Sequence, residues 1–143
     1  NNFQLNIVGR NPGYKVINLS KKDNIKLYSN VNSVKEFYNE ANIVVLPFQL
    51  GGGSKLKLLE ALNYNVPIVA SNIGLVGCDD LKKFVFMEEL NPNSFADTIN
   101  QIVSNYSYAL QLSKSGKEFI VDKYDWSSIV TNLVNSIDKS MIR

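Results

Sequence analysis

The stretch of sequence that decides the fold is LPFQLGGGSKLKLLEALNYNVPIVAS, residues 46–71. It starts at the end of a short unbroken apolar run, residues 43–46, which Pro47 closes and which is typical of a buried parallel strand. Leucines recur at helical spacing after the glycines, and Pro67 to Ala70 form a second buried-strand run. The stretch therefore predicts a strand, a glycine-rich loop, a helix and another strand.

The same alternation continues on both sides of this stretch. Further strands are predicted at residues 3–8, 25–29 and 84–87, and helical spacing is found at residues 34–41, 95–102, 108–121 and 129–141. Strands that alternate with helices predict an α/β fold, a Rossmann-like open parallel sheet with helices on both faces. Ligands of such folds bind outside the carboxyl ends of the strands. That rule selects the loops at residues 9–13, 30–33, 49–54 and 71–80.

The glycine-rich loop predicts an anion site. Gly51, Gly52 and Gly53 carry no side chains that would keep a ligand away from the backbone. The helix that begins near Ser54 offers unpaired backbone N–H groups and the positive end of the helix dipole. A diphosphate is the anion that suits this arrangement best.

Two charged residues on the following helix extend that site. Lys57 and Glu60 are three residues apart and so lie on one helical face, where a cation can meet phosphates and a carboxylate can bind a ribose diol. Spacing alone equally allows a plain alternative, in which the glycines form a flexible connection, Ser54 caps the helix and the charged pair is solvated.

Composition excludes several other classes of function. The chain has 143 residues, 45% hydrophobic and 20% charged, which is typical of one globular domain. Its formal charge of +2 comes without a dense basic run, so we expect no nucleic-acid partner. With no histidine and Cys78 as its one cysteine, it lacks imidazole bases, a disulfide and the usual zinc ligands, so we expect no metal. No apolar run reaches the roughly 20 residues of a transmembrane helix, and a cytoplasmic setting is expected.

Several segments, in the same order along the chain, resemble landmarks of a known family. They lie at residues 5–9, 41–47, 53–62, 66–71 and 123–127. Together they resemble the C-terminal donor-binding domain of the family 4 glycosyltransferases, also called glycosyl transferases group 1. The resemblance implies the C-terminal half of a GT-B fold and covers nearly the whole chain.

The resemblance also implies a function. Family members transfer a sugar, often a hexose, from a nucleotide diphosphate sugar to a glycan, polysaccharide or lipid acceptor, usually with retention of anomeric configuration. It assigns the ribose hydroxyls to Glu60, the diphosphate and sugar to Gly51 through Lys57, and the nucleobase to the backbone near Val31. It implies no cofactor besides the nucleotide sugar substrate and no metal. We assign no catalytic residue.

The chain departs from the family pattern in two places. Many members carry a second glutamate where this chain has Gly52. The family's domain usually opens with a strand and turn that bring an arginine and a lysine to the diphosphate, and Arg10 can replace them only in part. We therefore expect residues 1–143 to be a donor-binding domain without its first strand-helix unit and without its N-terminal acceptor domain. Alone it should be inactive, and any peripheral membrane contact would come through the absent domain.

Two other functions remain open at this stage. A degenerate, non-catalytic nucleotide- or protein-binding module would also explain Gly52 and the absent first strand. A nucleotide-sugar epimerase of the same two-domain plan is disfavoured, because such enzymes usually rely on further carboxylates and histidines.

Residues outside the central stretch are interpreted as structural. We assign no role to Cys78 and expect the Asp79-Asp80 pair to be solvated. Asp125 or Ser127 is predicted to cap the last helix, which Tyr124 and Trp126 pack down.

Overall fold

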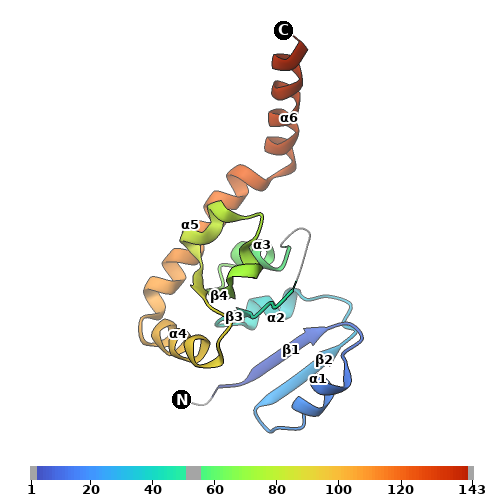
Figure 1. The fold of residues 1–143 in the computed structure, drawn as a ribbon, viewed down its shortest axis with the longest axis vertical. Coiled ribbons are helices and arrows are strands. Elements are labelled where there is room, and N and C mark those ends of the chain that lie inside the picture. Colours follow the sequence, from blue (N-terminus) through green and yellow to red (C-terminus); the bar gives the residue numbers. More distant parts are fainter. Residues whose placement is uncertain (1–2, 51–55, 142–143) are drawn as a thin grey trace. The chain divides into compact units, whose positions relative to one another are not determined.

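The computed structural model describes residues 3–50 and 56–141. The chain divides into two compact units, Asn1–Ala41 and Asn42–Arg143 (Figure 1). Each unit has its own parallel sheet, and we describe each by itself. The prediction of parallel strands flanked by helices is confirmed, although the strands lie in two hydrogen-bonded sheets and not in one.

The first unit is built on two parallel strands. Its elements are β1 (Leu5–Gly9), α1 (Tyr14–Leu19), β2 (Ile25–Ser29) and α2 (Lys35–Glu40). β1 pairs with β2 in a register that runs from Leu5 opposite Ile25 to Gly9 opposite Ser29. The Tyr28 ring of β2 lies 4.7 Å from the Phe37 ring of α2, centroid to centroid, so this pair fixes α2 against the sheet.

The sequence analysis missed α1. It predicted only a tight turn at residues 9–13, but a short helix follows directly and begins after Gly13. None of the residues of α1 is buried. Its six residues are fewer than the window of about 11–18 residues over which a helical period is recognised.

The second unit contains the remaining elements. In chain order they are β3 (Val44–Leu46), α3 (Leu56–Asn63), β4 (Ile68–Ser71), the 3-10 turns η1 (Asn72–Leu75) and η2 (Asp79–Phe84), β5 (Phe86–Glu88), α4 (Pro92–Ser104), α5 (Tyr106–Tyr124) and α6 (Trp126–Met141). Three parallel strands form its sheet in the order β3-β4-β5.

β4 is the centre of this sheet, and all four of its residues are buried. Val45, Val69 and Phe86 lie side by side in the register and pack with α4 residues such as Phe95 and Ile102. Successive residues of a strand point to opposite faces, so the full burial of β4 means that both faces are covered. α3 and α4 both contact β4.

The C-terminal end of α3 is closed by a Schellman motif. Asn65 has a positive φ of 55°. Its N–H donates to the carbonyl of Leu62 (2.9 Å), and the N–H of Val66 donates to that of Ala61 (3.0 Å). The Ser113 hydroxyl of α5 donates to the Asn65 carbonyl at 2.9 Å. These bonds fix the end of α3 against α5.

α5 passes close to α3 at Gly116, which is buried. A Cβ at this position would lie 2.7 Å from Cδ2 of Leu62 and 3.0 Å from Cβ of Phe84. Glycine costs about 1 kcal/mol of helix propensity relative to alanine. The close approach explains why a glycine stands inside this helix.

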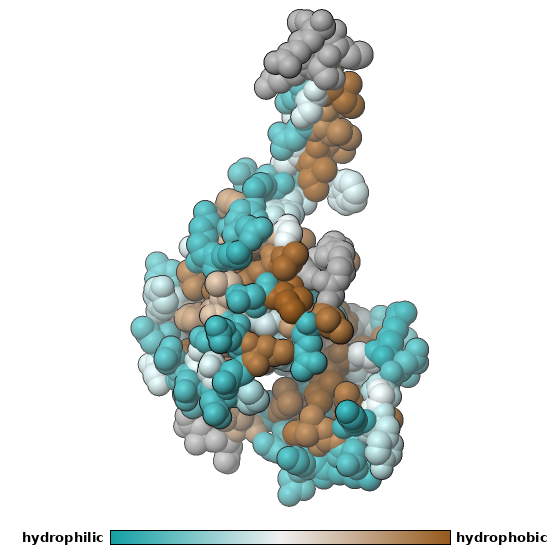
Figure 2. Space-filling model, viewed as in Figure 1, coloured by the Kyte–Doolittle hydropathy of each residue, from teal (hydrophilic) through white to brown (hydrophobic). Residues whose placement is uncertain are grey.

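α6 follows the predicted cap. The Asp125 carboxylate accepts a hydrogen bond from the N–H of Ser127 at 3.0 Å, which confirms the predicted N-cap. The prediction that Trp126 packs this helix down is wrong, because Trp126 is 77% exposed. Figure 2 shows apolar side chains along α6; they are Ile129, Val130, Leu133, Val134 and Ile137.

The apolar pattern of α6 predicted its helix correctly, but each of those five side chains is between 41% and 58% exposed. Within the described part of this unit, α6 contacts α5, the helix that precedes it, and these apolar side chains stay exposed. In the described ranges, no helix has the length and apolar character needed to cross a membrane.

We predict that Gly116→Ala destabilises the protein by about 1 kcal/mol. A methyl group must displace the buried Leu62 or Phe84 side chain, and overpacking of this kind costs about 1–3 kcal/mol, more than the helix propensity that alanine adds. Urea unfolding of the two proteins measures the difference. Ser115→Ala, on the exposed side of the same helix, is the control and should be neutral or slightly stabilising. An equal gain from both substitutions would contradict the close approach of α5.

Candidate functional site

The candidate site begins where β3 ends. The N–H of Phe48 donates to the carbonyl of Leu46 at 3.0 Å, which closes a γ-turn around Pro47. The Ser71 hydroxyl, at the carboxyl end of β4, donates to the carbonyl of Phe48 at 2.7 Å. Ser71 is only 2% exposed. A part-buried hydrogen bond thus joins the ends of two neighbouring strands just before the glycine-rich loop.

Lys57 and Glu60 lie on the exposed side of α3. The opposite side of the helix buries Leu58, Ala61 and Leu62. The ammonium of Lys57 lies 5.3 Å from the centroid of the Phe48 ring, close to the end of β3. The predicted cation and carboxylate are therefore both exposed. Their assignment to a ligand stays a prediction.

The predicted phosphate cradle cannot be placed in the same way. Gly51, Gly52, Gly53 and Ser54 lie outside the described residues. The described part of α3 begins at Leu56, one turn before Glu60.

Two more of the predicted site residues come together in the first unit. Arg10 and Val31 line one hollow of about 380 Å³ at the carboxyl ends of β1 and β2. Its other lining residues are Val8, Gly9, Asn32, Ser33 and Val34. The N–H of Asn11 donates to the side-chain oxygen of Asn30 at 3.3 Å, so a hydrogen bond links the loops after the two strands. The hollow thus lies in one of the loop regions that the fold rule selects.

The predicted residues are therefore divided between the two units. Arg10 and Val31 belong to Asn1–Ala41, and Lys57 and Glu60 belong to Asn42–Arg143. Each pair lies at or beside the carboxyl ends of strands in its own parallel sheet.

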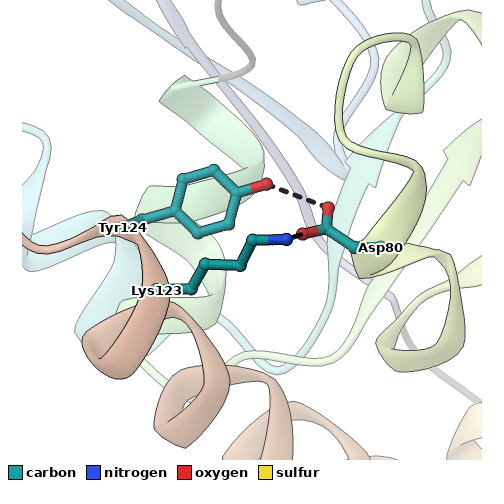
Figure 3. Close-up of polar contacts among 3 residues, drawn as sticks. All are labelled: Asp80, Lys123 and Tyr124. Atoms are coloured by element: carbon teal, nitrogen blue, oxygen red, sulfur yellow. Dashed lines mark hydrogen bonds and ion pairs between the residues drawn. The ribbon is translucent and has the colours of Figure 1, made fainter. Parts of the chain in front are cut away.

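The loop after β4 is held by a polar cluster that sequence analysis missed. Figure 3 shows that the side chains of Lys123 and Tyr124, at the end of α5, point to the Asp80 carboxylate of η2. Lys123 forms an ion pair with Asp80, and the Tyr124 hydroxyl donates to it at 2.9 Å. The expectation that Asp80 is solvated is wrong for this reason. The partners are 43 and 44 residues away, beyond any local sequence signal.

This cluster shifts the pKa values of its members. The Lys123 ammonium, followed by the Tyr124 hydroxyl, lowers the pKa of Asp80 in spite of partial burial. Burial, followed by the nearby Asp80 carboxylate, raises the pKa of Tyr124. Asp80 therefore stays ionised and Tyr124 stays neutral near pH 7, which keeps the hydrogen bond between them. Within residues 3–50 and 56–141, no group of three or more acidic, cysteine or histidine side chains could hold a metal.

Comparison with known proteins places these features in a family. The family model described as glycosyl transferases group 1 matches residues 1–105. An uncharacterized glycosyltransferase of Methanocaldococcus jannaschii is 25% identical over 114 residues, which are 76% of this chain and 28% of that protein. The poly(ribitol-phosphate) alpha-N-acetylglucosaminyltransferase of Staphylococcus aureus is 33% identical over 86 residues, 58% of this chain and 17% of that protein.

A solved structure has a similar fold. The crystal structure of Anabaena HepE in complex with UDP matches with a TM-score of 0.80 and 12% identity, over 96% of this chain and 41% of that chain. Such likeness confirms the predicted Rossmann-like fold of GT-B glycosyltransferases. The chain spans about a quarter of the length of its Methanocaldococcus relative and less than half of HepE.

We predict that Asp80→Asn lowers stability at pH 7 by up to about 1 kcal/mol, because it removes a partly exposed ion pair. A lowered carboxyl pKa stabilises the fold above the unfolded value of about 3.9, and this contribution is lost as the pH falls through the lowered pKa. The difference in free energy of unfolding between wild type and Asp80→Asn should therefore become smaller as the pH falls. Urea unfolding at pH 7, 5 and 3 measures it.

Asp79→Asn is the matched control for this series. Asp79 forms an exposed ion pair with Lys82 within η2, with its side chain 74% exposed. This substitution should change stability little at any pH. A stability gap for Asp80→Asn that persists unchanged at pH 3 would contradict the ionised cluster.

Proposed function

The chain belongs to the glycosyl transferases group 1 family, and from that premise we propose that residues 1–143 are the nucleotide-sugar-binding part of a GT-B glycosyltransferase. The enzyme transfers a sugar, of the hexose type, from a nucleotide diphosphate sugar to a glycan, polysaccharide or lipid acceptor. Transfer proceeds with retention of anomeric configuration. The nucleotide sugar is a substrate, and no further cofactor is needed.

The observation that carries this proposal is the placement of Lys57 and Glu60 on the exposed side of α3. A lysine ammonium is a point charge suited to phosphate oxygens, and it lies here beside the end of β3. A carboxylate accepts hydrogen bonds from two adjacent hydroxyls, which a ribose presents. The spacing of the two residues fits a ribose joined to a diphosphate.

The hollow in the first unit is, by itself, suited to a nucleobase. Its volume of about 380 Å³ is within the range of small-molecule sites. Val8, Val31 and Val34 supply apolar surface for the flat face of a base, while Asn32 and Ser33 can hydrogen-bond its edge. Arg10, which lines the same hollow, is suited to phosphate oxygens. Anabaena HepE, which shares the fold, was crystallised in complex with UDP.

These residues bind and orient the donor. When the bond between the sugar and the diphosphate breaks, negative charge builds up on the leaving diphosphate. A cation at Lys57 stabilises that charge in the transition state more than in the ground state. Glu60 holds the ribose and thereby the position of the bond that breaks.

We propose that the acceptor binds to a part of the protein outside residues 1–143. The relatives are much longer than this chain, which covers 28% and 17% of the two described above. In this proposal an N-terminal domain of the same protein binds the acceptor, and a further strand-helix unit completes the donor domain. Residues 1–143 alone would then bind a donor nucleotide without transferring the sugar.

We predict that one of the nucleoside diphosphates UDP, GDP and ADP raises the unfolding temperature of the full-length protein. A ligand at about 100 times its Kd stabilises the folded state by about 2.7 kcal/mol. Glu60→Gln keeps the size of the side chain but removes its charge, so it should abolish most of the shift. A thermal-shift titration measures both effects.

Glu118→Gln, an exposed substitution on α5, is the matched control and should leave the shift unchanged. Absence of stabilisation by all three diphosphates would reject the proposal and favour a non-catalytic binding module.

A further inference from the structure

Phe48 is held in place by its own backbone. Its N–H donates to the carbonyl of Leu46, and its carbonyl accepts the hydroxyl of Ser71. Both of its backbone polar groups are therefore satisfied at the carboxyl ends of β3 and β4. The position of the residue does not depend on its ring.

The ring of Phe48 packs against a glycine. Gly74, in η1, is buried, and a Cβ placed on it would lie 3.4 Å from Cδ2 of Phe48. The same Cβ would lie 3.5 Å from Cβ of Ala70 and 3.6 Å from the carbonyl oxygen of Leu46. The ring therefore packs on the turn that follows β4, and it is half-buried there.

The Phe48 ring also contacts the charge of Lys57. The ammonium lies 5.3 Å from the ring centroid, within the range of a cation–π interaction. A lysine side chain has many rotamers, and an exposed one samples several of them. An exposed cation–π contact favours one arrangement by about two- to fivefold. The contact with the Phe48 ring is enough to favour this arrangement of the Lys57 side chain.

We propose that Phe48 is a positioning residue that holds the Lys57 ammonium beside the carboxyl end of β3, ready for the diphosphate of the donor. The inference rests on the proposed function. One face of the ammonium meets the ring, and its three N–H groups leave donors for phosphate oxygens. Phe48 then favours ligands that carry phosphate, because it acts only through the ammonium of Lys57.

The first test examines the protein without nucleotide. Ring currents of Phe48 should move the NMR signals of the Lys57 ε-protons upfield in the full-length protein with labelled lysine. Phe48→Leu should abolish that shift and Phe48→Tyr should keep it. Lys57 ε-protons at ordinary positions in the wild type would overturn the proposal, whether or not a nucleotide binds.

The second test is a double-mutant cycle with Phe48→Leu and Lys57→Met, which keeps the length of the stem. Calorimetry gives the Kd of each variant for UDP, GDP and ADP and for the matching nucleosides. Phe48→Leu should weaken diphosphate binding about two- to fivefold, leave nucleoside binding unchanged and have no further effect in Lys57→Met. Phe48→Tyr should restore the wild-type ratio of the two affinities.

The outcomes separate the two proposals. If Phe48→Leu weakens the binding of both ligand classes equally, or weakens it as much in the Lys57→Met background, Phe48 has a packing role. Either result overturns the proposal that Phe48 positions Lys57 and leaves the proposed function standing. A wild type that binds none of the diphosphates rejects the proposed function, and the role of Phe48 in diphosphate selection falls with it.

Discussion

A buried hydroxyl holds the end of β3 to the end of β4. Ser71, which is 2% exposed, donates to the carbonyl of the half-buried Phe48. The bond fixes the point at which the chain leaves the sheet for the glycine-rich loop. The Phe48 ring beside that point contacts both the Lys57 ammonium and the turn at Gly74.

The rest of the second unit gives this point a rigid support. β4 is buried on both faces, and α3 is fixed at its C-terminal end by the positive φ of Asn65 and the hydroxyl of Ser113. α5 reaches α3 at Gly116 and ends in the cluster that holds Asp80. The exposed charges of α3 therefore project from a helix whose other contacts are buried, as binding residues need.

Local patterns in the sequence predicted the elements that have a strong apolar period. Residues 25–29 form β2 as expected, and the leucines after the glycines form α3. α1 was missed because its six residues are too few to show a helical period. The contacts of Ser71 with Phe48 and of Asp80 with Lys123 span 23 and 43 residues, and local propensity carries no information on such pairs. Trp126 was misjudged because an apolar pattern predicts a helix face and not the surface that covers it.

The central claim is that the exposed charges of α3 bind the diphosphate and ribose of the donor. Titration of the isotope-labelled full-length protein with UDP, GDP and ADP, followed by backbone amide NMR shifts, tests it most directly. The account predicts the largest shifts at residues 56–60 for the diphosphate that binds. Shifts that spare this segment while the nucleotide binds elsewhere on the chain would contradict it.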